Sequence, residues 1–178
     1  RERACALVLK NVRKPTNEWA TALRLADLTS TLLSKYARPL RAESEILLAT
    51  LAKTASAESA PIWQRALALE ACRVVAADPQ LLRHLFVTYD RTSSSVNVFT
   101  TFTASVCALL KSPSVAFHQH GEYIEAHFLR HHRNAFSGRA PTFNVALYSD
   151  ADGSHLTNDY TAALAVESQV YIARAIGT

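Results

Sequence analysis

The chain has 178 residues, of which 49% are hydrophobic and 19% are charged, a balance that supports a buried core and excludes a disordered chain. No apolar run reaches the ~18–20 residues that a membrane span needs, and the first residues, Arg1 to Cys5, lack the layout of a signal peptide. We therefore expect a soluble, cytoplasmic protein, while the net charge of +4 keeps nucleic-acid binding open as an alternative.

Glycine and proline divide the chain into helical segments. The first of only four glycines is Gly121, so everything before it avoids the residue that most readily interrupts a helix. Four prolines recur at intervals of about 20 residues and precede or open helical patterns, where a first-turn proline costs little. They are Pro15, Pro39, Pro61 and Pro79. We predict an all-α fold with at least five helices before Ser112 and no sheet of three or more strands.

Between these prolines the apolar residues keep a helical period. The first helix after Pro15 has a predicted face of Trp19, Leu23, Ala26, Leu33 and Tyr36, broadened by Leu25, Leu28 and Leu32. The helix after Pro39 has Ile46, Leu47, Thr50 and Leu51. The stretch from Pro61 to Ala77 is apolar on most sides, as in a helix packed between neighbours, so we predict that it is the central element.

Asp78 and Pro79 form a predicted N-cap and first turn of the next helix. Its apolar residues are Leu81, Leu82, Leu85, Phe86 and Tyr89. We expect Leu82, Leu85, Phe86 and Tyr89 to anchor this helix in the core, so that Phe86→Ala costs roughly 3–5 kcal/mol of stability. A polar turn, Arg91 to Ser95, leads to a further helix over about residues 96–111.

A single one of the predicted helices cannot bury its own apolar face, so the helices must pack together. The short connections between them favour antiparallel hairpins. We therefore predict an armadillo- or HEAT-like α-solenoid of stacked antiparallel helices over residues 1–112, although no internal sequence repeat is present. Residues 113–156 hold three of the four glycines, and we interpret them as a loop-rich, loosely packed insertion with one short helix, whose deletion should cost little stability. Residues 157–178 form a predicted C-terminal helix that packs back on the core.

Histidines offer the clearest case for chemistry. Five of the seven lie within 15 residues of one another in the predicted insertion, at His118, His120, His127, His131 and His132, and the spacing of His127 and His131 places both imidazoles on one helical face. No His-Glu-x-x-His motif, nucleophile turn or phosphate-binding glycine loop accompanies them. We expect no catalytic residues, no metal site and no cofactor, and therefore no enzyme.

The three cysteines are widely spaced and no Cys-x-x-Cys pair is present. Cys5, Cys72 and Cys107 lie among alanine, leucine and valine, which predicts three reduced, buried thiols in a reducing compartment. The sequence contains no methionine, so we also expect it to be an internal piece of a longer protein.

The positive charge is concentrated at the N-terminal end. Residues 1–41 hold nine lysines or arginines against three acids, whereas the rest has 10 against 12. Lys10, Arg13 and Lys14 are the predicted contacts to anionic lipid, although such residues are more often a solvated face. A protein partner ranks first among the interpretations, an anionic membrane second and nucleic acid a distant third.

The run from Leu85 to Arg91, followed by Ser94 to Phe99, resembles the signature box of the HUS domain found in large Arf guanine-nucleotide exchange factors. That box normally has Asn before Tyr-Asp and Cys after it, where this chain has Thr88 and Arg91. The chain is most similar to the related Mon-two family, which lacks the catalytic domain. Further segments fit the same family in the same order, over roughly Trp19 to Leu110: Leu33 to Tyr36, Glu43 to Leu48, Trp63 to Glu70 and Asp78 to Leu82.

This resemblance implies a non-catalytic scaffold, peripheral on trans-Golgi network and endosome membranes, that acts in vesicle traffic. Its implied partners are the neighbouring N-terminal domain of the same protein, a Dopey-type protein and an Arf-like GTPase. The residues that carry over as partner contacts are Phe86, Tyr89, Asp90 and Asn97. Two alternatives stay open: the regulatory HUS domain of an active exchange factor, and a basic helical-repeat module that binds RNA.

A Tyr-Asp pair at a helix end also has a purely structural interpretation. The ring packs beneath the turn, and the carboxylate accepts N–H groups near Thr92 or Ser93. Both interpretations are compatible, because a carboxylate that fixes a loop also fixes the surface that the loop presents.

Overall fold

The computed structural model describes residues 2–12, 16–91, 97–111, 143–144, 153 and 156–177, and within these ranges it contains helices and no strand. The α-helices are α1 (Glu2–Val12), α2 (Trp19–Tyr36), α3 (Arg41–Ser56), α4 (Ile62–Ala76), α5 (Pro79–Leu85), α6 (Val98–Lys111) and α8 (Asn158–Gly177). A π-helix, η1 (Phe86–Asp90), continues α5. The predicted all-α class and the predicted minimum of five helices before Ser112 are confirmed.

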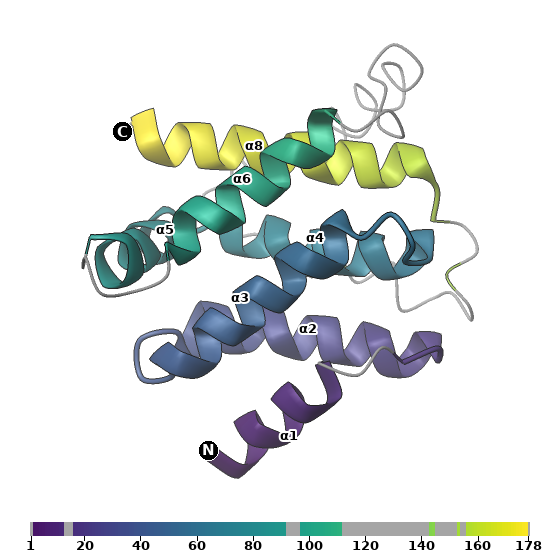
Figure 1. Ribbon diagram of the computed structural model, residues 1–178, viewed down its shortest axis with the longest axis horizontal. Coiled ribbons are helices and arrows are strands. Elements are labelled where there is room, and N and C mark those ends of the chain that lie inside the picture. The colour runs from purple at the N-terminus through teal and green to yellow at the C-terminus, as the bar shows by residue number, and fades with distance from the viewer. Residues whose placement is uncertain are drawn as a thin grey trace.

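The helices stack in two layers (Figure 1). One layer holds α2, α4 and α8, with α4 in contact with both neighbours, and the other holds α3 and α6, with α1 packed against α3. Successive long helices thus alternate between layers, and each packs on the helix next but one in the chain. This arrangement agrees with the predicted stacking of helices, while the armadillo or HEAT type of the repeat stays a prediction.

Helix α4 is the central element, as predicted. Every residue from Arg65 to Ala76 is buried, which requires neighbours on all sides of the helix. Leucines and small residues fill most of this surface, so the helices of both layers approach α4 closely. Three charged residues, Arg65, Glu70 and Arg73, lie in the same buried run.

Helix boundaries follow the predicted signals. The carboxylate of Asp78 accepts the backbone N–H groups of Gln80 and Leu81 at 3.0 and 3.1 Å, and Pro79 occupies the first turn of α5. Pro61 occupies the N-cap position of α4. The buried Arg65 side chain donates its Nε–H to the carbonyl oxygen of Ala55 at the end of α3. These contacts satisfy backbone groups that a helix end leaves unpaired.

The face predicted for α2 is partly wrong at its edges. Trp19, Leu23, Ala26 and Leu33 are buried, whereas Tyr36 and Leu28 are exposed. Tyr36 is the last residue of α2, and Leu28 lies outside the buried set of this helix. The buried Trp19 ring meets Trp63 of α4 edge to face, with ring centroids 5.8 Å apart.

Four described residues belong to the segment predicted as a loosely packed insertion, and they do not follow that expectation. Phe143 and Leu156 are buried in the main core. Gly153 adopts a positive φ of 71° beneath Trp19, where an added Cβ would lie 2.6 Å from the indole ring. Phe143 and Leu156 therefore contribute to the core. The rest of the segment, including the predicted helix over 122–133, lies outside the described residues, and the domain boundaries stay a prediction.

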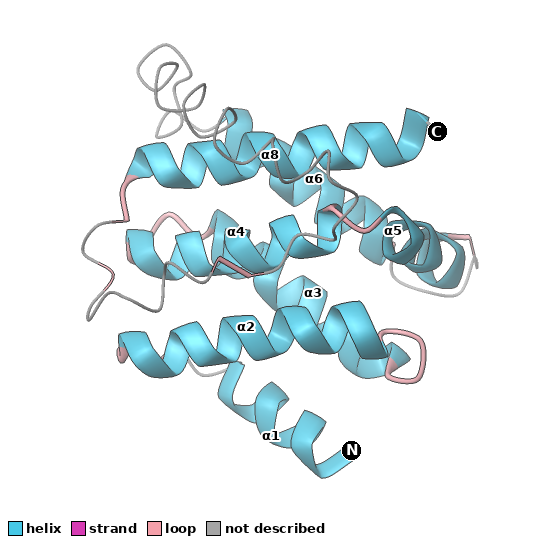
Figure 2. Cartoon of the chain, turned by 180° about the vertical axis from the view of Figure 1, so that it is seen from behind, coloured by secondary structure: helices cyan, strands magenta, loops and turns pink. Residues whose placement is uncertain are grey.

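The C-terminal helix α8 packs on α4. Figure 2 shows α8 above α4 from behind, and α8 also contacts α5 and α6. None of the described helices combines the length and the apolar character needed to cross a lipid bilayer.

Candidate functional site

The segment from α5 to η1 forms a ridge at one end of the molecule. The backbone N–H of Arg91 donates to the carbonyl oxygen of Phe86 at 3.1 Å, five residues back, so the last turn is wider than an α-helical turn. Such π-turns occur often at functional sites. All four residues of the signature box that were predicted as partner contacts lie in or beside this turn.

Tyr89 is buried and fixes the ridge to the start of α3. Its hydroxyl donates to the carbonyl oxygen of Arg41 at 2.6 Å. In return, Arg41 donates from Nη2 to the carbonyl oxygen of Thr88 at 3.0 Å, and its guanidinium lies 6.0 Å from the centre of the Tyr89 ring. Burial raises the pKa of Tyr89. This reciprocal pair holds η1 against α3.

Asp90 fixes the other side of the ridge to α6. Its two carboxylate oxygens accept the backbone N–H groups of Phe99 and Thr100 at 2.9 and 2.8 Å, and the Thr100 hydroxyl at 2.6 Å. These N–H groups belong to the first turn of α6, so Asp90 caps that helix from the end of another one. The structural role proposed for the carboxylate is present, but its partners are in α6, while Thr92 and Ser93 lie outside the described residues.

Asn97 directly precedes α6 and is exposed. Its carbonyl oxygen accepts the backbone N–H of Thr101 at 2.9 Å, which starts the helix. Asn97 therefore holds the backbone position of the N-cap, while the Asp90 side chain supplies the capping oxygens. The amide of Asn97 is available at the surface beside the ridge.

Phe86 does not lie in the core, and the prediction that it anchors the ridge there is wrong. Its side chain is 47% exposed and touches Phe99 of α6 edge to face, with ring centroids 5.7 Å apart. The preceding Leu85 is fully buried and takes the core position, and a helix turns about 100° to the next residue. Val87 follows and is 44% exposed. The ridge thus presents two adjacent apolar side chains to solvent.

His84 lies on the flank of the ridge that faces the turn between α2 and α3. Burial lowers the pKa of its imidazole, and the positive charges of Arg38 and Arg41 lower it further. Nδ1 is 3.2 Å from the Thr88 hydroxyl, while Nε2 is buried without a hydrogen-bond partner among the described residues. The imidazole is therefore neutral at physiological pH.

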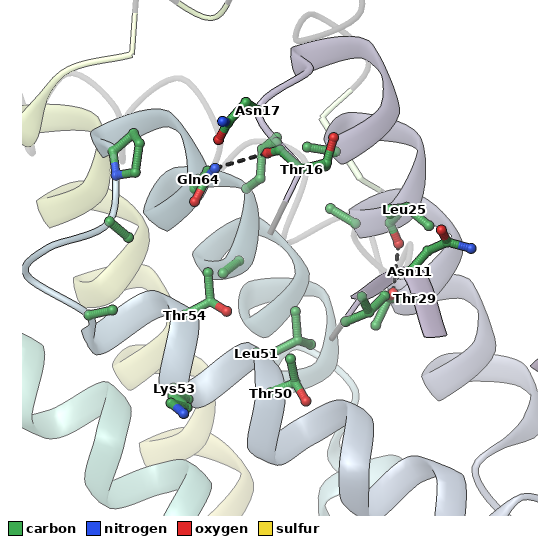
Figure 3. A pocket seen from close by; sticks show the side chains of 18 of the residues that line it. Asn11, Thr16, Asn17, Leu25, Thr29, Thr50, Leu51, Lys53, Thr54 and Gln64 are labelled. Atoms are coloured by element: carbon green, nitrogen blue, oxygen red, sulfur yellow. Dashed lines mark hydrogen bonds between the residues drawn. The ribbon is translucent and has the colours of Figure 1, made fainter. Parts of the chain in front are cut away.

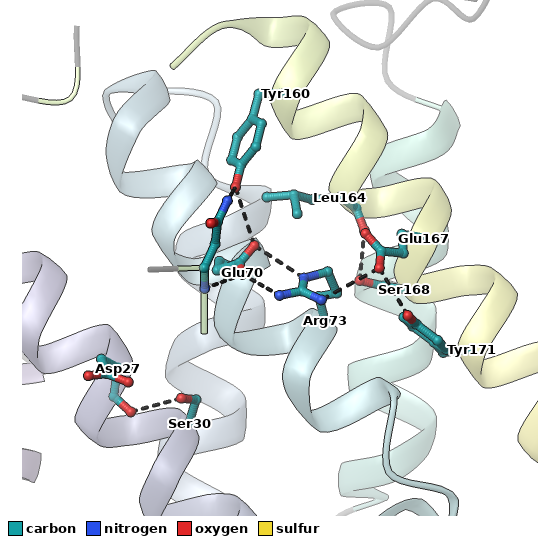
Figure 4. Close-up of polar contacts among 10 residues, drawn as sticks. Asp27, Ser30, Glu70, Arg73, Tyr160, Leu164, Glu167, Ser168 and Tyr171 are labelled. Carbon is teal, nitrogen blue, oxygen red and sulfur yellow. Dashed lines mark hydrogen bonds and ion pairs between the residues drawn. The ribbon is translucent and has the colours of Figure 1, made fainter. Parts of the chain in front are cut away.

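A buried polar network joins α4 to α8 (Figure 4). Arg73 pairs with Glu70 on its own helix and with Glu167 of α8, whose carboxylate lies 3.5 Å from the guanidinium. The Glu70 carboxylate also accepts the backbone N–H of Asn144 and the hydroxyl of Tyr160. Burial alone would lower the pKa of Arg73, but the charge of Glu70, the hydrogen bond to Glu70 and the charge of Glu167 together outweigh it, so the pKa is raised.

The local sequence pattern does not predict this network. Glu70 and Arg73 are charged residues inside an otherwise apolar helix, and that contrast was the available signal of a buried ion pair. Glu167 lies 94 residues from Arg73, so nothing in the local sequence connects them. Tyr171 also donates to Glu167 at 3.0 Å, and burial together with that carboxylate raises the pKa of Tyr171 to about 12.

A groove of about 620 Å³ runs between α2, α3 and α4, beside the end of α1 (Figure 3). Its floor is apolar and includes Leu51 and Leu67, and its rim carries amides and hydroxyls such as Asn17 and Thr54. The Gln64 amide donates to the carbonyl oxygen of Thr16 across one end at 3.0 Å. Lys53 is the one ionisable side chain among the described residues of the lining. The sequence analysis gave no sign of this groove.

Other predicted residues are placed as follows. Lys10 is exposed near the end of α1, whereas Arg13 and Lys14 lie outside the described residues. Cys72 is buried, and burial raises the pKa of its thiol to about 12. Cys107 is exposed and accepts a hydrogen bond from Gln169 of α8, so the prediction of a buried thiol there is wrong, because this position of α6 stays open to solvent beside α8. The five clustered histidines fall outside the described ranges, as does the side chain of Cys5.

The described helices and their ridge form an all-α domain, and the comparison with protein families gives this domain its class. The sequence model described as Mon2/Sec7/BIG1-like, HUS domain, matches residues 1–98. The chain therefore belongs to this family. The match begins earlier than the predicted Trp19 and ends at the first residue of α6, so it includes α1 and the whole ridge.

The most informative relatives are Mon2 proteins. The chain is 29% identical over 129 residues to Protein MON2 homolog from Xenopus laevis, covering 63% of this chain and 7% of that protein. It is 30% identical over 115 residues to Protein MON2 from Saccharomyces cerevisiae, covering 64% and 7%, and 29% identical over 131 residues to Protein MON2 homolog from Homo sapiens, covering 63% and 8%. The chain thus spans less than a tenth of these relatives. No solved structure matches it.

Proposed function

We propose that this chain is a non-catalytic, protein-binding HUS domain of a Mon2-type protein, which acts as a scaffold in vesicle traffic on trans-Golgi network and endosome membranes. Membership of the family and the Mon2 names of the relatives support the trafficking role. The observation that carries the binding role is the exposure of Phe86 and Val87 on a ridge that is otherwise held rigidly.

The proposed binding surface, which we call the ridge surface, consists of Phe86, Val87 and Asn97. Two neighbouring apolar side chains with a polar amide beside them have the mixed character of a protein interface. Tyr89 and Asp90 act differently, because one is buried and the other has both carboxylate oxygens occupied by α6. These two residues position the ridge surface, and this positioning matters more to binding than any direct contact that they make with a partner.

The neighbouring N-terminal domain of the same protein is the first proposed partner. A rigid ridge costs little conformational entropy when it docks, which suits a permanent contact within one protein. A Dopey-type protein and an Arf-like GTPase are the further proposed partners of the whole protein. Lys10, Arg13 and Lys14 are the proposed contacts to anionic lipid, and Lys10 is exposed as such a contact requires.

Titration calorimetry between the chain and the neighbouring N-terminal domain tests this proposal. Replacing Phe86 and Val87 together by alanine should weaken binding by at least about tenfold, because exposed apolar residues at the centre of an interface carry much of its affinity. The matched control replaces Leu28 and Ile62 together by alanine. These residues are exposed to a similar degree, 43% and 39%, on other parts of the surface.

The control variant should bind like the parent chain, and both variants should retain a cooperative thermal transition. Equal affinity of all three proteins would contradict the ridge surface. Binding of RNA with a submicromolar affinity that does not depend on Phe86 and Val87 would instead favour the alternative helical-repeat RNA module. Stimulated nucleotide exchange by a protein that contains this domain would favour the regulatory HUS domain of an active exchange factor.

A further inference from the structure

A basic corner lies beside the ridge surface, where the turn between α2 and α3 meets η1. Figures 1 and 2 both place this turn and α5 with η1 at the same end of the molecule. The corner consists of Arg38 in the turn and Arg41 at the start of α3. Arg41 is held in place by the Thr88 carbonyl oxygen and by the Tyr89 ring. Its orientation is therefore set before any partner arrives.

The charge of this corner is not neutralised within the described part of the chain. Neither Arg38 nor Arg41 forms an ion pair with a described carboxylate. Both guanidinium groups lie close enough to His84 for their charges to lower the pKa of its imidazole, in addition to the larger effect of burial. Glu43 and Glu45 act on Tyr89 from α3, but neither reaches an arginine within ion-pair distance. The two guanidinium groups therefore have no carboxylate within ion-pair distance among the described residues.

The apolar part of the ridge surface is next to this charge. Val87 directly precedes Thr88, whose carbonyl oxygen binds Arg41, and Phe86 lies one residue further along toward α6. A partner that covers Val87 therefore lies within reach of the guanidinium groups on one flank and of Phe86 on the other. Such a partner needs acidic groups on one side and apolar groups on the other.

We propose that the basic corner and the ridge surface together bind an acidic, amphipathic segment of a partner protein, with its carboxylates on Arg38 and Arg41 and its apolar side chains on Val87 and Phe86. This inference rests on the proposed function and adds the chemistry of the partner. Guanidinium groups bind carboxylates through two parallel hydrogen bonds, and a preoriented arginine loses less side-chain entropy on pairing.

A protein segment fits the corner better than an anionic membrane does. A membrane presents a continuous plane of negative charge, which would also approach Glu43 and Glu45 beside the corner. A peptide can place its carboxylates against the arginines alone and leave the glutamates facing solvent. The arrangement of charges therefore favours a partner that places its carboxylates against the arginines and away from the glutamates.

Fluorescence anisotropy with two labelled synthetic peptides tests the inference. One is an amphipathic helix of leucine and glutamate, and the other has glutamine in place of every glutamate. The acidic peptide should bind the chain roughly tenfold more tightly at about 50 mM salt, and the advantage should shrink at about 300 mM, where charges are screened over shorter distances. Equal binding of the two peptides at low salt would overturn the inference.

Charge reversal then locates the site. Arg38→Glu should weaken binding of the acidic peptide by at least about fivefold, because attraction is replaced by repulsion. Lys53→Glu makes the same change of charge on an exposed residue of α3 that lines the groove, and it should leave binding unchanged. Equal losses in both variants would mean that only net charge matters, which overturns the assignment to the corner.

Two further measurements separate this inference from its neighbours. If vesicles of phosphatidylcholine and phosphatidylserine bind the chain through Arg38 while the acidic peptide does not, the corner is a membrane contact and the inference is wrong. If the Phe86 and Val87 variant loses the N-terminal domain but Arg38→Glu binds that domain and the acidic peptide like the parent, the proposed function stands and the acidic partner is wrong. Loss of both interactions on charge reversal, with Lys53→Glu unaffected, supports the inference.

Discussion

At the scale of single residues, Tyr89 and Asp90 explain why the signature box has its form. The Tyr89 hydroxyl binds the start of α3, and the Asp90 carboxylate binds the first turn of α6. One dipeptide thus joins two helices on opposite sides of η1. Both side chains are engaged inside the molecule, so we propose that the box acts mainly by holding its exposed neighbours in position.

Asp90→Ala removes the carboxylate that caps the first turn of α6. The lost hydrogen bonds to Phe99 and Thr100 should lower the free energy of unfolding by about 2 kcal/mol, a typical cost for a removed cap with charged character. Chemical denaturation of the parent and the variant measures this change. Glu58→Ala, at an exposed position outside any helix, is the control and should change stability little. Equal stability of the parent and Asp90→Ala would mean that the cap is not formed.

His84 gives the ridge a defined pH dependence. Its pKa lies below the ordinary value of 6.5 in the folded chain, so the unfolded chain takes up a proton more readily. The stability that the neutral imidazole contributes is therefore present above pH of about 6.5 and is lost as the pH falls below it. Between pH 7.5 and 5.5, roughly one unit on each side of 6.5, the free energy of unfolding should fall less steeply for His84→Gln than for the parent. Parallel profiles would contradict the burial of His84 beside Arg38 and Arg41.

Phe86 is the residue where the sequence analysis failed most clearly. Apolar residues at 82, 85, 86 and 89 suggest one wide core face, but Leu85 occupies the core position and Phe86 turns outward. Its contact with Phe99 is a single edge-to-face pair, so Phe86→Ala should cost about 1 kcal/mol rather than the value expected of a core residue. The distinction depends on the neighbouring helices, which the local pattern does not contain.

At the scale of elements, most helices were predictable because capping residues and prolines mark where they begin. Asp78 and Pro79 cap and start α5 as the sequence indicates, and the unbroken apolar stretch after Pro61 is the central helix. The wide turn of η1 was not predictable. It arises because Tyr89 and Asp90 each bind a different helix, and those helices are far apart in the sequence.

The junction of α4 and α8 was predicted only as packing, yet it depends on buried charges. Glu70→Ala leaves Arg73 with Glu167 as its remaining acidic partner among the described residues and also removes the acceptor for the Asn144 N–H. We expect a loss of about 3–5 kcal/mol, since a broken buried pair leaves a poorly compensated charge.

A second substitution tests the reason for that loss. In the double variant Glu70→Ala with Arg73→Met, the stranded charge is gone, so thermal unfolding should occur at a higher temperature than in Glu70→Ala alone. If Arg73→Met instead lowers the stability of Glu70→Ala by the full cost of a second core mutation, the two residues act independently.

At the scale of the whole molecule, the chain is a two-layer stack that exposes its family signature at one end. The lining of the groove between α2, α3 and α4 includes no residue of the ridge surface, so the two features can be tested separately. The Mon2-type relatives are much longer than this chain, and the ridge surface is where we propose that the rest of such a protein docks.

Hydrogen–deuterium exchange of the chain, alone and with the neighbouring N-terminal domain, tests this central claim most directly, because it needs no substitution and reports on every described helix. Docking on the ridge surface predicts slower exchange on complex formation in residues 84–91 and at the start of α6, with no change in α1 or in the helices that line the groove. Protection confined to the groove or to the outer face of α8, with unchanged exchange along the ridge, would contradict the account.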